Sequence, residues 1–385
     1  MKLTIKSILL VLSVAFYMQG YAQKPEPVYS VVRQVHDFDW YETQAKAWKQ
    51  EIDNGSTNAM AWVYWSEANR MAHYFCDASK WESKKGDYFV PNAQLVEAAE
   101  KAIPNSFEYY FLKMQAERNN KAISEDYLMK AQALRPYDDL LLPWLMNQSV
   151  VANDKVGMAQ VSTKWFESNE MPQELYATAY NNLISLDTNA ILLTDGDNDS
   201  YPAWILQAAR KVRPDVLILN ISMSRRIDSY REKVFAENGI KPLVFANDSV
   251  RTDQNLFKHL ITNVAGRPIY VSVFTSEDVY KAYVKNMYFI GLSLKYSPKP
   301  FDNLAVLRNN VENKYMLDFL KQSFQNNPSQ SVINMVNGGY LASFQKLYTY
   351  YKQIGQRDKA IKIKALAVTV AKNSGLTDWL KYFEK

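Results

Sequence analysis

Hydrophobic and polar positions follow two different patterns along the chain, and the change between them divides it into three stretches. From about Asp39 to Asn182, and again from Lys314 onward, apolar side chains recur every three or four residues, which is the spacing of amphipathic helices. Between them, residues 188–297 carry short apolar runs separated by helical segments. We therefore predict helices at both ends and an alternation of strands and helices in the middle.

The middle stretch predicts an α/β domain with a parallel sheet. The expected strands are 190–194, 216–223, 243–245, 269–274 and 287–294. Helices are expected between them, at 205–212, 229–238, 255–264 and 277–284. Two apolar strands joined by a helical crossover of about twenty residues form a βαβ unit whose strands run parallel. Because the alternation continues, we predict an open doubly wound α/β domain over residues 186–300.

Both helical stretches resemble tetratricopeptide repeats in part. Pro104 and Pro136 lie 32 residues apart and enclose a predicted helix pair, close to the repeat period of about 34 residues. Near the C-terminus, the residues at the spacing of that repeat are Leu347, Tyr351, Gly355, Ala360 and Ala367. Lys364 and Lys372 replace the expected aromatic residue and proline. We predict tetratricopeptide-like regions at 23–185 and 301–385. The alternative is an irregular helical bundle with no true repeat.

The first 22 residues have the pattern of a secretory signal peptide. Lys2 and Lys6 give a positive start, the run from Ile8 to Met18 is apolar, and Ala22 ends a small-residue cleavage site. That run is shorter than the ~20 residues of a membrane-spanning helix. We expect a chain that is exported, most simply to the periplasm, with no transmembrane segment after cleavage. Peripheral association with the cell envelope is an alternative.

Composition and charge favour a helix-rich protein that does not bind nucleic acids. The 385 residues include only 12 Gly, whereas Tyr, Phe and Trp number 26, 17 and 9. This balance fits packed helices with short connections better than a turn-rich β-sandwich. Without Lys2 and Lys6, the net charge is +3, and no run of Lys and Arg is interleaved with aromatic residues. We therefore expect no nucleic-acid partner.

Three acidic residues follow the first predicted strand directly, at Asp195, Asp197 and Asp199. Ligands of open α/β sheets bind beyond the carboxyl ends of the strands, so this loop occupies the favoured place. Three neighbouring carboxylates repel one another unless a cation or several N–H donors compensate. Ca²⁺ bound by these aspartates is one explanation. The EF-hand pattern fails, however, because Ser200 stands where Gly is needed and Leu206 where the bidentate Glu belongs.

A second explanation of the acidic loop needs no ligand. Asp199 or Ser200 would cap the following helix, with Pro202 in its first turn and the carboxylates near the positive end of the helix dipole. A third is a site for a polar ligand such as a sugar. Phosphates are disfavoured by the three acids, and no Gly-rich nucleotide-binding motif follows the strand. All three explanations stay open, and Ca²⁺ is the one cofactor among them.

The sequence around this loop resembles part of a known family. Residues 192–204 read LLTDGDNDSYPAW, followed by VRPDV at 212–216 and LNIS at 219–222. These segments resemble the soluble C-terminal part of bacterial protein O-mannosyltransferase-like membrane proteins, with its G-D-N-D-T-Y-P-L-W and R-P-D-V-x-x-x-N-x-S segments. The resemblance covers about 35 residues, with Ser200 in place of Thr and Ala203 in place of Leu. In that family, tetratricopeptide-like helices accompany the α/β region.

The resemblance implies a stand-alone envelope domain similar to the soluble part of those enzymes. Their transferase chemistry belongs to a membrane half that this chain does not show, so no catalytic residue is implied. The loop, the resemblance and the basic residues after the second strand together give candidate ligand-binding residues: Asp195, Gly196, Asp197, Asn198, Asp199, Tyr201, Trp204, Arg213, Asp215, Asn220, Ser222 and Arg225. An Asp197–Arg225 pair across the crevice is conceivable as an ion pair or as a ligand clamp.

Two functional hypotheses follow. The favoured one is an exported, non-catalytic scaffold or adaptor that binds protein partners in the cell envelope, because helical-repeat surfaces serve extended partners. The resemblance adds a secretion or glycosylation assembly as its setting. The alternative is a glycan- or metal-binding α/β domain, enzymatic or not, that uses the loop from Asp195 to Asp199.

Overall fold

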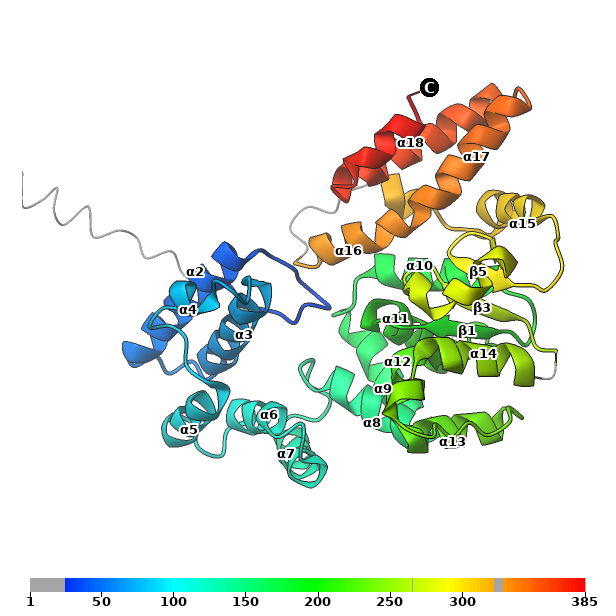
Figure 1. The fold of residues 1–385 in the computed structure, drawn as a ribbon. Coiled ribbons are helices and arrows are strands. Elements are labelled where there is room, and N and C mark those ends of the chain that lie inside the picture. The colour runs from blue at the N-terminus through cyan, green and yellow to red at the C-terminus, as the bar shows by residue number, and fades with distance from the viewer. Residues whose placement is uncertain (1–24, 265, 322–327, 385) are drawn as a thin grey trace, which may run out of the picture. The chain divides into compact units, whose positions relative to one another are not determined.

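A computed structural model describes residues 25–264, 266–321 and 328–384, so the expected signal peptide lies outside the described residues. The chain divides into two compact units (Figure 1). The first ends at Pro136, apart from Val32–Gln34, and the second contains those three residues and everything from Tyr137 onward.

Paired helices make up the first unit. They are α2 (Phe38–Asp53), α3 (Met60–Phe75), α4 (Trp81–Lys84), α5 (Asn92–Ala102), α6 (Phe107–Ala116) and α7 (Lys121–Leu134). α2 packs on α3, and α6 packs on α7. The Ser106 and Asn120 side chains accept backbone N–H groups at the starts of α6 and α7, which fixes where these helices begin. Leu128 and Ala131 of α7 are buried, so this pair is compatible with a helical repeat.

Three further helices belong to the second unit, although the sequence pattern grouped them with the N-terminal helices. They are α8 (Leu142–Ala152), α9 (Lys155–Ser168) and α10 (Gln173–Ser185). Both α9 and α10 pack against α11 (Asp197–Arg210), the first helix after the sheet begins. These helices therefore help to place the acidic loop, which lies at the start of α11.

A mixed five-stranded sheet forms the centre of the second unit. Its strands are β1 (Ile191–Thr194), β2 (Leu217–Asn220), β3 (Ile269–Ser272), β4 (Met287–Phe289) and β5 (Ser293–Tyr296). The strand order is β2-β1-β3-β5-β4. β1 runs parallel to both β2 and β3, whereas β5 is antiparallel to β3 and to β4. The parallel part agrees with the prediction, and the antiparallel hairpin at its edge does not.

The hairpin replaces the single strand that was predicted at 287–294. Gly291 has a φ of +140°, and a Cβ at this position would collide with the Tyr315 hydroxyl. The chain turns back here, and the Ile290 N–H donates to the Ser293 carbonyl at 3.0 Å. Because Gly291 interrupts the apolar run at 287–294, this run forms parts of two short strands.

Three other predicted elements differ in the structure. The strand predicted at 216–223 ends at Asn220, because α12 (Ile221–Arg226) begins directly after it. Residues 243–245 form no strand; instead, the Phe245 ring lies against the guanidinium groups of Arg231 and Arg251, at 4.9 and 5.2 Å from its centroid. The helix predicted at 277–284 is two short 3₁₀ segments, η2 (Glu277–Val279) and η3 (Lys281–Asn286).

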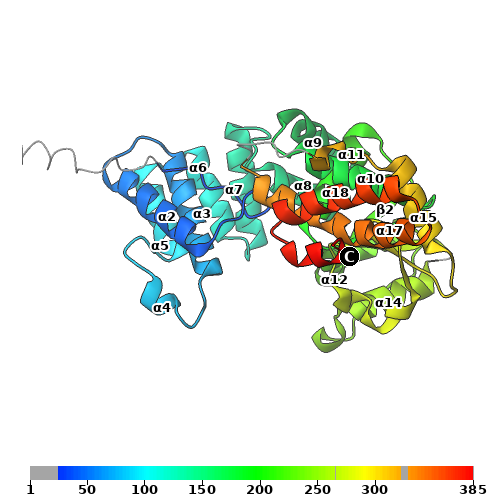
Figure 2. The same cartoon turned by 90° about the horizontal axis from the view of Figure 1, so that it is seen from above.

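Helices cover both faces of the sheet. The chain passes from β1 to β2 through α11, and from β2 to β3 through α12 (Ile221–Arg226), α13 (Asp228–Glu237) and α14 (Asp253–Asn263). Figures 1 and 2 show α10 and α11 on one face and α12 and α14 on the other. β1 thus lies between β2 and β3, and the connections to these two strands cross opposite faces of the sheet. Sheets of this kind bind ligands in a crevice at such a point, here between the carboxyl ends of β1 and β3.

A helical hairpin lies in the C-terminal region. α17 (Leu341–Gln353) packs against α18 (Arg357–Asn373), and η7 (Thr377–Tyr382) follows. The other elements of this region are α15 (Asn303–Asn309), η4 (Asn310–Lys314), η5 (Asp318–Lys321), α16 (Gln330–Asn337) and η6 (Gly338–Tyr340), and η1 (Asp248–Val250) lies earlier in the chain. Of the positions that fit the repeat, Leu347, Tyr351, Ala360 and Ala367 are buried.

Most of the described chain is helical, but none of its described helices combines the length and the apolar character needed to cross a membrane. The longest, α18, has 17 residues, and its apolar face is buried in the C-terminal core through Ala360, Ala367 and Val370.

Candidate functional site

Residues from two strands meet at the carboxyl ends of β1 and β2. Asp195 follows β1 and Asn220 ends β2, and the parallel register brings them to the same edge of the sheet. The Ser222 hydroxyl donates to Oδ1 of Asp195 at 2.7 Å, and the Asn220 amide donates to the Asp195 carbonyl at 3.3 Å. These three sequence candidates therefore lie together.

Asn220 also belongs to a buried hydrogen-bond network. Its amide donates to Oγ of Ser200 at 3.0 Å, and the Ser200 hydroxyl donates to Oγ1 of Thr194 at 2.7 Å. Oδ1 of Asn220 accepts the Met223 N–H at 2.9 Å and so caps α12. The network joins both strands to the helices that follow them, which gives these polar groups an internal structural role.

The start of α11 differs from the expected capping arrangement. Gly196 is the N-cap, so neither Asp199 nor Ser200 caps the helix, and Pro202 lies inside it rather than in its first turn. Asp199 is the third helical residue and reaches back, accepting the Asp195 N–H at Oδ2 over 3.4 Å. The Asp199 carboxyl thus accepts from the backbone just before the helix and lies at the positive end of the helix dipole.

Asp199 is buried and lines a small cavity. The residue is 8% exposed, and Oδ1 has no hydrogen-bond partner in the described part of the chain. The cavity, of about 10 Å³, has room for one water molecule. Its walls include Thr178 and Asn182 of α10, Asn198 of α11, and Phe274 after β3. It therefore lies where the chain leaves β1 and β3.

Burial raises the pKa of Asp199 to about 7. The nearby Ser272 hydroxyl and the backbone N–H groups of Asp195 and Gly196 oppose this rise, and the Asp195 charge adds to it. Asp199 is thus a carboxyl that can change its charge near neutral pH.

The aromatic candidates after the loop belong to the core. Tyr201 and Trp204 are each 4% exposed. The Tyr201 ring packs against Trp165 of α9 at 5.1 Å and against Trp204 at 6.0 Å. Asp197, by contrast, is exposed at the surface, and its carboxylate lies near the Tyr201 hydroxyl. These rings join α11 to α9 and are not available to a ligand in the crevice.

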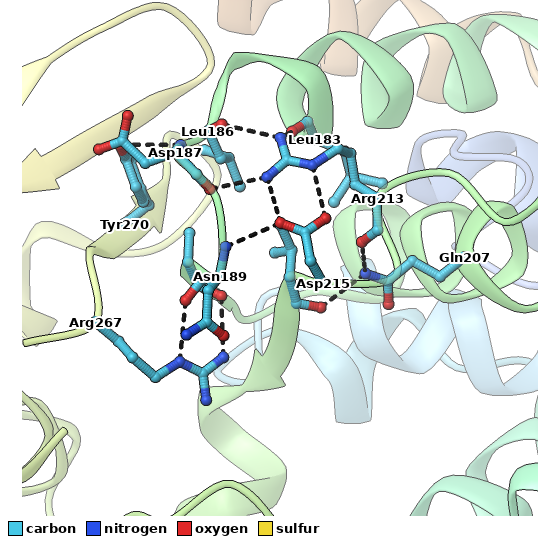
Figure 3. A network of polar contacts seen from close by, with 11 residues as sticks. Leu183, Leu186, Asp187, Asn189, Gln207, Arg213, Asp215, Arg267 and Tyr270 are labelled. Carbon is cyan, nitrogen blue, oxygen red and sulfur yellow. Dashed lines mark hydrogen bonds and ion pairs between the residues drawn. The ribbon is translucent and has the colours of Figure 1, made fainter. Parts of the chain in front are cut away.

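Arg213 and Asp215 form an internal clamp (Figure 3). Nε and Nη2 of Arg213 donate to the two carboxylate oxygens of Asp215, each at 2.8 Å. Nη1 donates to the carbonyls of Leu183 and Leu186, each at 2.9 Å, and Nη2 also donates to the Asp187 carbonyl at 2.8 Å. All the N–H donors of the guanidinium are therefore used. The hydrogen bond with Arg213 holds the pKa of Asp215 well below its usual range.

This clamp lies at the opposite end of the parallel strands from the acidic loop. The Asn189 N–H, just before β1, donates to Asp215, just before β2, at 2.9 Å. Arg267, just before β3, donates to the Asn189 carbonyl at 3.0 Å (Figure 3). The candidates Arg213 and Asp215 thus tie together the amino ends of three strands and do not join Asp195, Asn220 and Ser222.

Arg225 lies after β2 as expected but has a different partner. Its Nε donates to the Asp253 carboxylate at 2.5 Å, so the Asp197–Arg225 pair does not form. This ion pair joins α12 to α14.

The three aspartates of the loop do not converge on one point. In residues 25–264, 266–321 and 328–384, no three His, Cys, Asp or Glu side chains group as metal ligands would. The carboxylates instead have separate surroundings: Asp195 accepts from Ser222, Asp197 is exposed, and Asp199 is buried.

Sequence reasoning missed the far wall of the crevice, which comes from α10 and from the end of β3. Thr178 and Asn182 carry no signal, because a polar residue in a helix does not reveal which face it occupies. Ser272 and Phe274 could have been found, since they end a predicted strand and the carboxyl-end rule applies to them as it does to Asp195.

Comparison with known proteins adds one finding. The family described as TMEM260-associated domain 2 matches residues 175–255, which contain β1, β2, the acidic loop and every candidate residue. TMEM260 is related to O-mannosyltransferase-like proteins. No curated protein and no solved structure matches the chain. Over these 81 residues, the chain is therefore similar to TMEM260-associated domain 2.

Proposed function

We propose that the protein is an exported, non-catalytic scaffold or adaptor that binds protein partners in the cell envelope, within a secretion or glycosylation assembly. The distribution of charge carries the proposal. The chain has 45 basic and 40 acidic residues, and 341–384, the C-terminal hairpin with η7, contains eight basic and three acidic ones. The rest has 37 of each sign, so the hairpin has a local excess of five basic residues.

The hairpin holds its charged residues on a well-packed core. Phe344, Leu347 and Ala367 are 0% exposed and share one core. Lys362 and Lys372 of α18 are exposed. A rigid surface with an excess of one charge attracts partners of the opposite sign and orients them before contact. This is the behaviour expected of an adaptor.

The arrangement of the candidate residues supports a role without catalysis. Asp195 accepts a hydrogen bond from Ser222, and the side chains of Arg213 and Asp215 bind each other at the far end of the strands. Groups engaged in this way hold the fold together. The resemblance to the soluble part of O-mannosyltransferase-like proteins supports an envelope setting.

Affinity capture tests the proposal. The mature chain, immobilised through its N-terminus, is incubated with envelope extract at about 0.1 M and about 0.5 M salt, because exposed charges are strongly screened at the higher concentration. We expect a stoichiometric protein partner whose recovery falls at high salt. Recovery of no stoichiometric partner at either concentration would contradict an adaptor role.

A second function is favoured by one observation, the unpartnered and buried Oδ1 of Asp199 at the crevice between β1 and β3. In this alternative, the α/β domain binds a glycan or a metal ion through the acidic loop. Calorimetry with Ca²⁺ and with neutral sugars tests it on the wild type, on Asp197→Ala/Asp199→Ala, and on Asp39→Ala/Asp87→Ala as a charge-matched control. Saturable binding lost only in the first variant would establish the site and overturn a purely scaffolding role.

A further inference from the structure

A groove lies between α17 and the C-terminal segment η7. Its volume is about 560 Å³. One wall is a single face of α17, where Gln345, Tyr348, Thr349 and Lys352 recur at helical spacing. The other wall includes Lys381 and Tyr382 of η7. This groove belongs to the hairpin that has five more basic than acidic residues.

The second wall of the groove is held in place by buried contacts. Phe383, directly after η7, is 0% exposed, and its ring centroid lies 5.5 Å from that of Tyr348. The Tyr348 hydroxyl donates to the Phe383 carbonyl at 3.3 Å. Because this residue anchors η7 on α17, the groove exists before any partner binds, which lowers the entropy cost of binding.

The groove combines cations, aromatic rings and neutral hydrogen-bonding groups. The Lys352 ammonium lies 5.6 Å from the Tyr348 ring centroid, and that of Lys381 lies 5.3 Å from the Tyr382 ring centroid. Gln345 and Thr349, on the α17 wall, can both donate and accept hydrogen bonds.

We propose that this groove binds an extended, acidic segment of a partner protein. Carboxylates of the segment would pair with Lys352 and Lys381, while Gln345 and Thr349 would bind its backbone. Charge complementarity selects this occupant, because the hairpin has five more basic than acidic residues and the groove has cations on both walls. The inference rests on the proposed adaptor function and specifies the partner's chemistry.

The shape of the surface favours a peptide over a membrane. A lipid bilayer presents a broad surface, and proteins that bind it insert an apolar face among the headgroups. Here Lys352 of α17 and Lys381 of η7 both line a recess, together with the polar side chains of Gln345 and Thr349. A single extended chain can enter such a recess.

Fluorescence anisotropy with a labelled octaglutamate peptide tests the proposal on the full mature chain. Two variants remove the same charge at different places: Lys352→Gln/Lys381→Gln in the groove, and Lys362→Gln/Lys364→Gln on α18. We expect saturable binding that weakens between about 0.05 M and about 0.3 M salt, as screened charge pairs do. The Kd should rise about tenfold or more in the groove variant and less than about twofold in the α18 variant.

Matched variants and probes make the test decisive. Lys352→Arg/Lys381→Arg should retain binding because it keeps both charges, and octalysine should not bind. An equal loss in the groove and α18 variants would overturn the proposal, as would absence of peptide binding or binding only to phosphatidylglycerol vesicles. If the groove variant captures the envelope partner as well as the wild type does, the groove proposal fails and the adaptor function stands.

Discussion

Arg213 and Asp215 form an ion pair with two hydrogen bonds, and it lies at the amino ends of the parallel strands. The two nitrogen–oxygen distances are 2.8 Å each, and the same guanidinium donates to three backbone carbonyls in the last turn of α10 and directly after it. The R-P-D-V segment of the family resemblance thus includes a structural clamp. It stands at the far end of the strands from the acidic loop.

Replacing this arginine should destabilise the second unit. Arg213→Lys keeps the charge but cannot reproduce the planar fork of donors, so buried carbonyls lose their partners. We expect a loss of about 2–3 kcal/mol in the free energy of unfolding, measured by urea denaturation. Arg210→Lys on the exposed end of α11 should change it by less than about 0.5 kcal/mol. Equal effects of the two substitutions would show that the clamp has no special role.

The buried carboxyl of Asp199 should make stability depend on pH. Its pKa is about 7 in the folded protein, whereas an unfolded Asp has a pKa of about 3.9. Between these values the folded state binds more protons than the unfolded state, so stability falls as pH rises and then levels off above about pH 7. Each unit of pKa difference corresponds to about 1.4 kcal/mol.

Asp199→Asn removes this titration while keeping an oxygen acceptor for the Asp195 N–H. The variant should therefore gain stability relative to the wild type as pH rises from about 4 to about 7. Thermal unfolding across this range measures the difference, and the exposed Asp87→Asn is the control, which should follow the wild type. A difference that does not vary with pH would contradict the assignment.

The buried network at the carboxyl ends of β1 and β2 should depend on Asn220. Asn220→Ala removes the cap of α12 and leaves the Ser200 hydroxyl without its donor, so we expect a loss of about 2 kcal/mol or more. Ser222→Ala removes one hydrogen bond and should cost about 1 kcal/mol. Chemical denaturation of both variants, with the exposed Asn92→Ala as control, measures which variant loses more free energy of unfolding. A larger effect of Ser222→Ala would refute the network as described.

The interface between α17 and α18 should tolerate no larger side chain at its small positions. Ala367 is 0% exposed, so Ala367→Leu must displace its neighbours and should destabilise the hairpin by about 1–3 kcal/mol. Ala365→Leu, on the exposed face of the same helix, should have little effect. Calorimetric unfolding of the two variants compares them, and an unchanged Ala367→Leu transition would mean that the helices do not interlock here.

Local patterns predicted the parallel strands well because β1 and β3 are buried along their whole length. The antiparallel hairpin was missed because its turn depends on one residue, Gly291, inside an apolar run. The grouping of α8 to α10 with the sheet was also missed, since periodicity reveals that a helix has an apolar face and does not reveal what that face contacts.

The sequence predicted the candidate residues that meet at strand ends. It did not predict the side-chain contacts between segments that are far apart in the sequence. Asp195 and Ser222 lie together because β1 and β2 are parallel. Arg213 was grouped with them by motif alone, and its clamp depends on loop carbonyls that no sequence pattern identifies. The groove at Lys352 and Lys381 joins two segments whose packing only the fold reveals.

Photo-crosslinking in the cell tests the central claim most directly. A benzoylphenylalanine residue at Thr349, in the groove, is compared with one at Lys362 on α18, and crosslinked species are identified by mass spectrometry. The adaptor account predicts one discrete envelope protein crosslinked from position 349, through an acidic segment, and little from position 362. Crosslinks to lipid alone, or to no partner from either position, would contradict it.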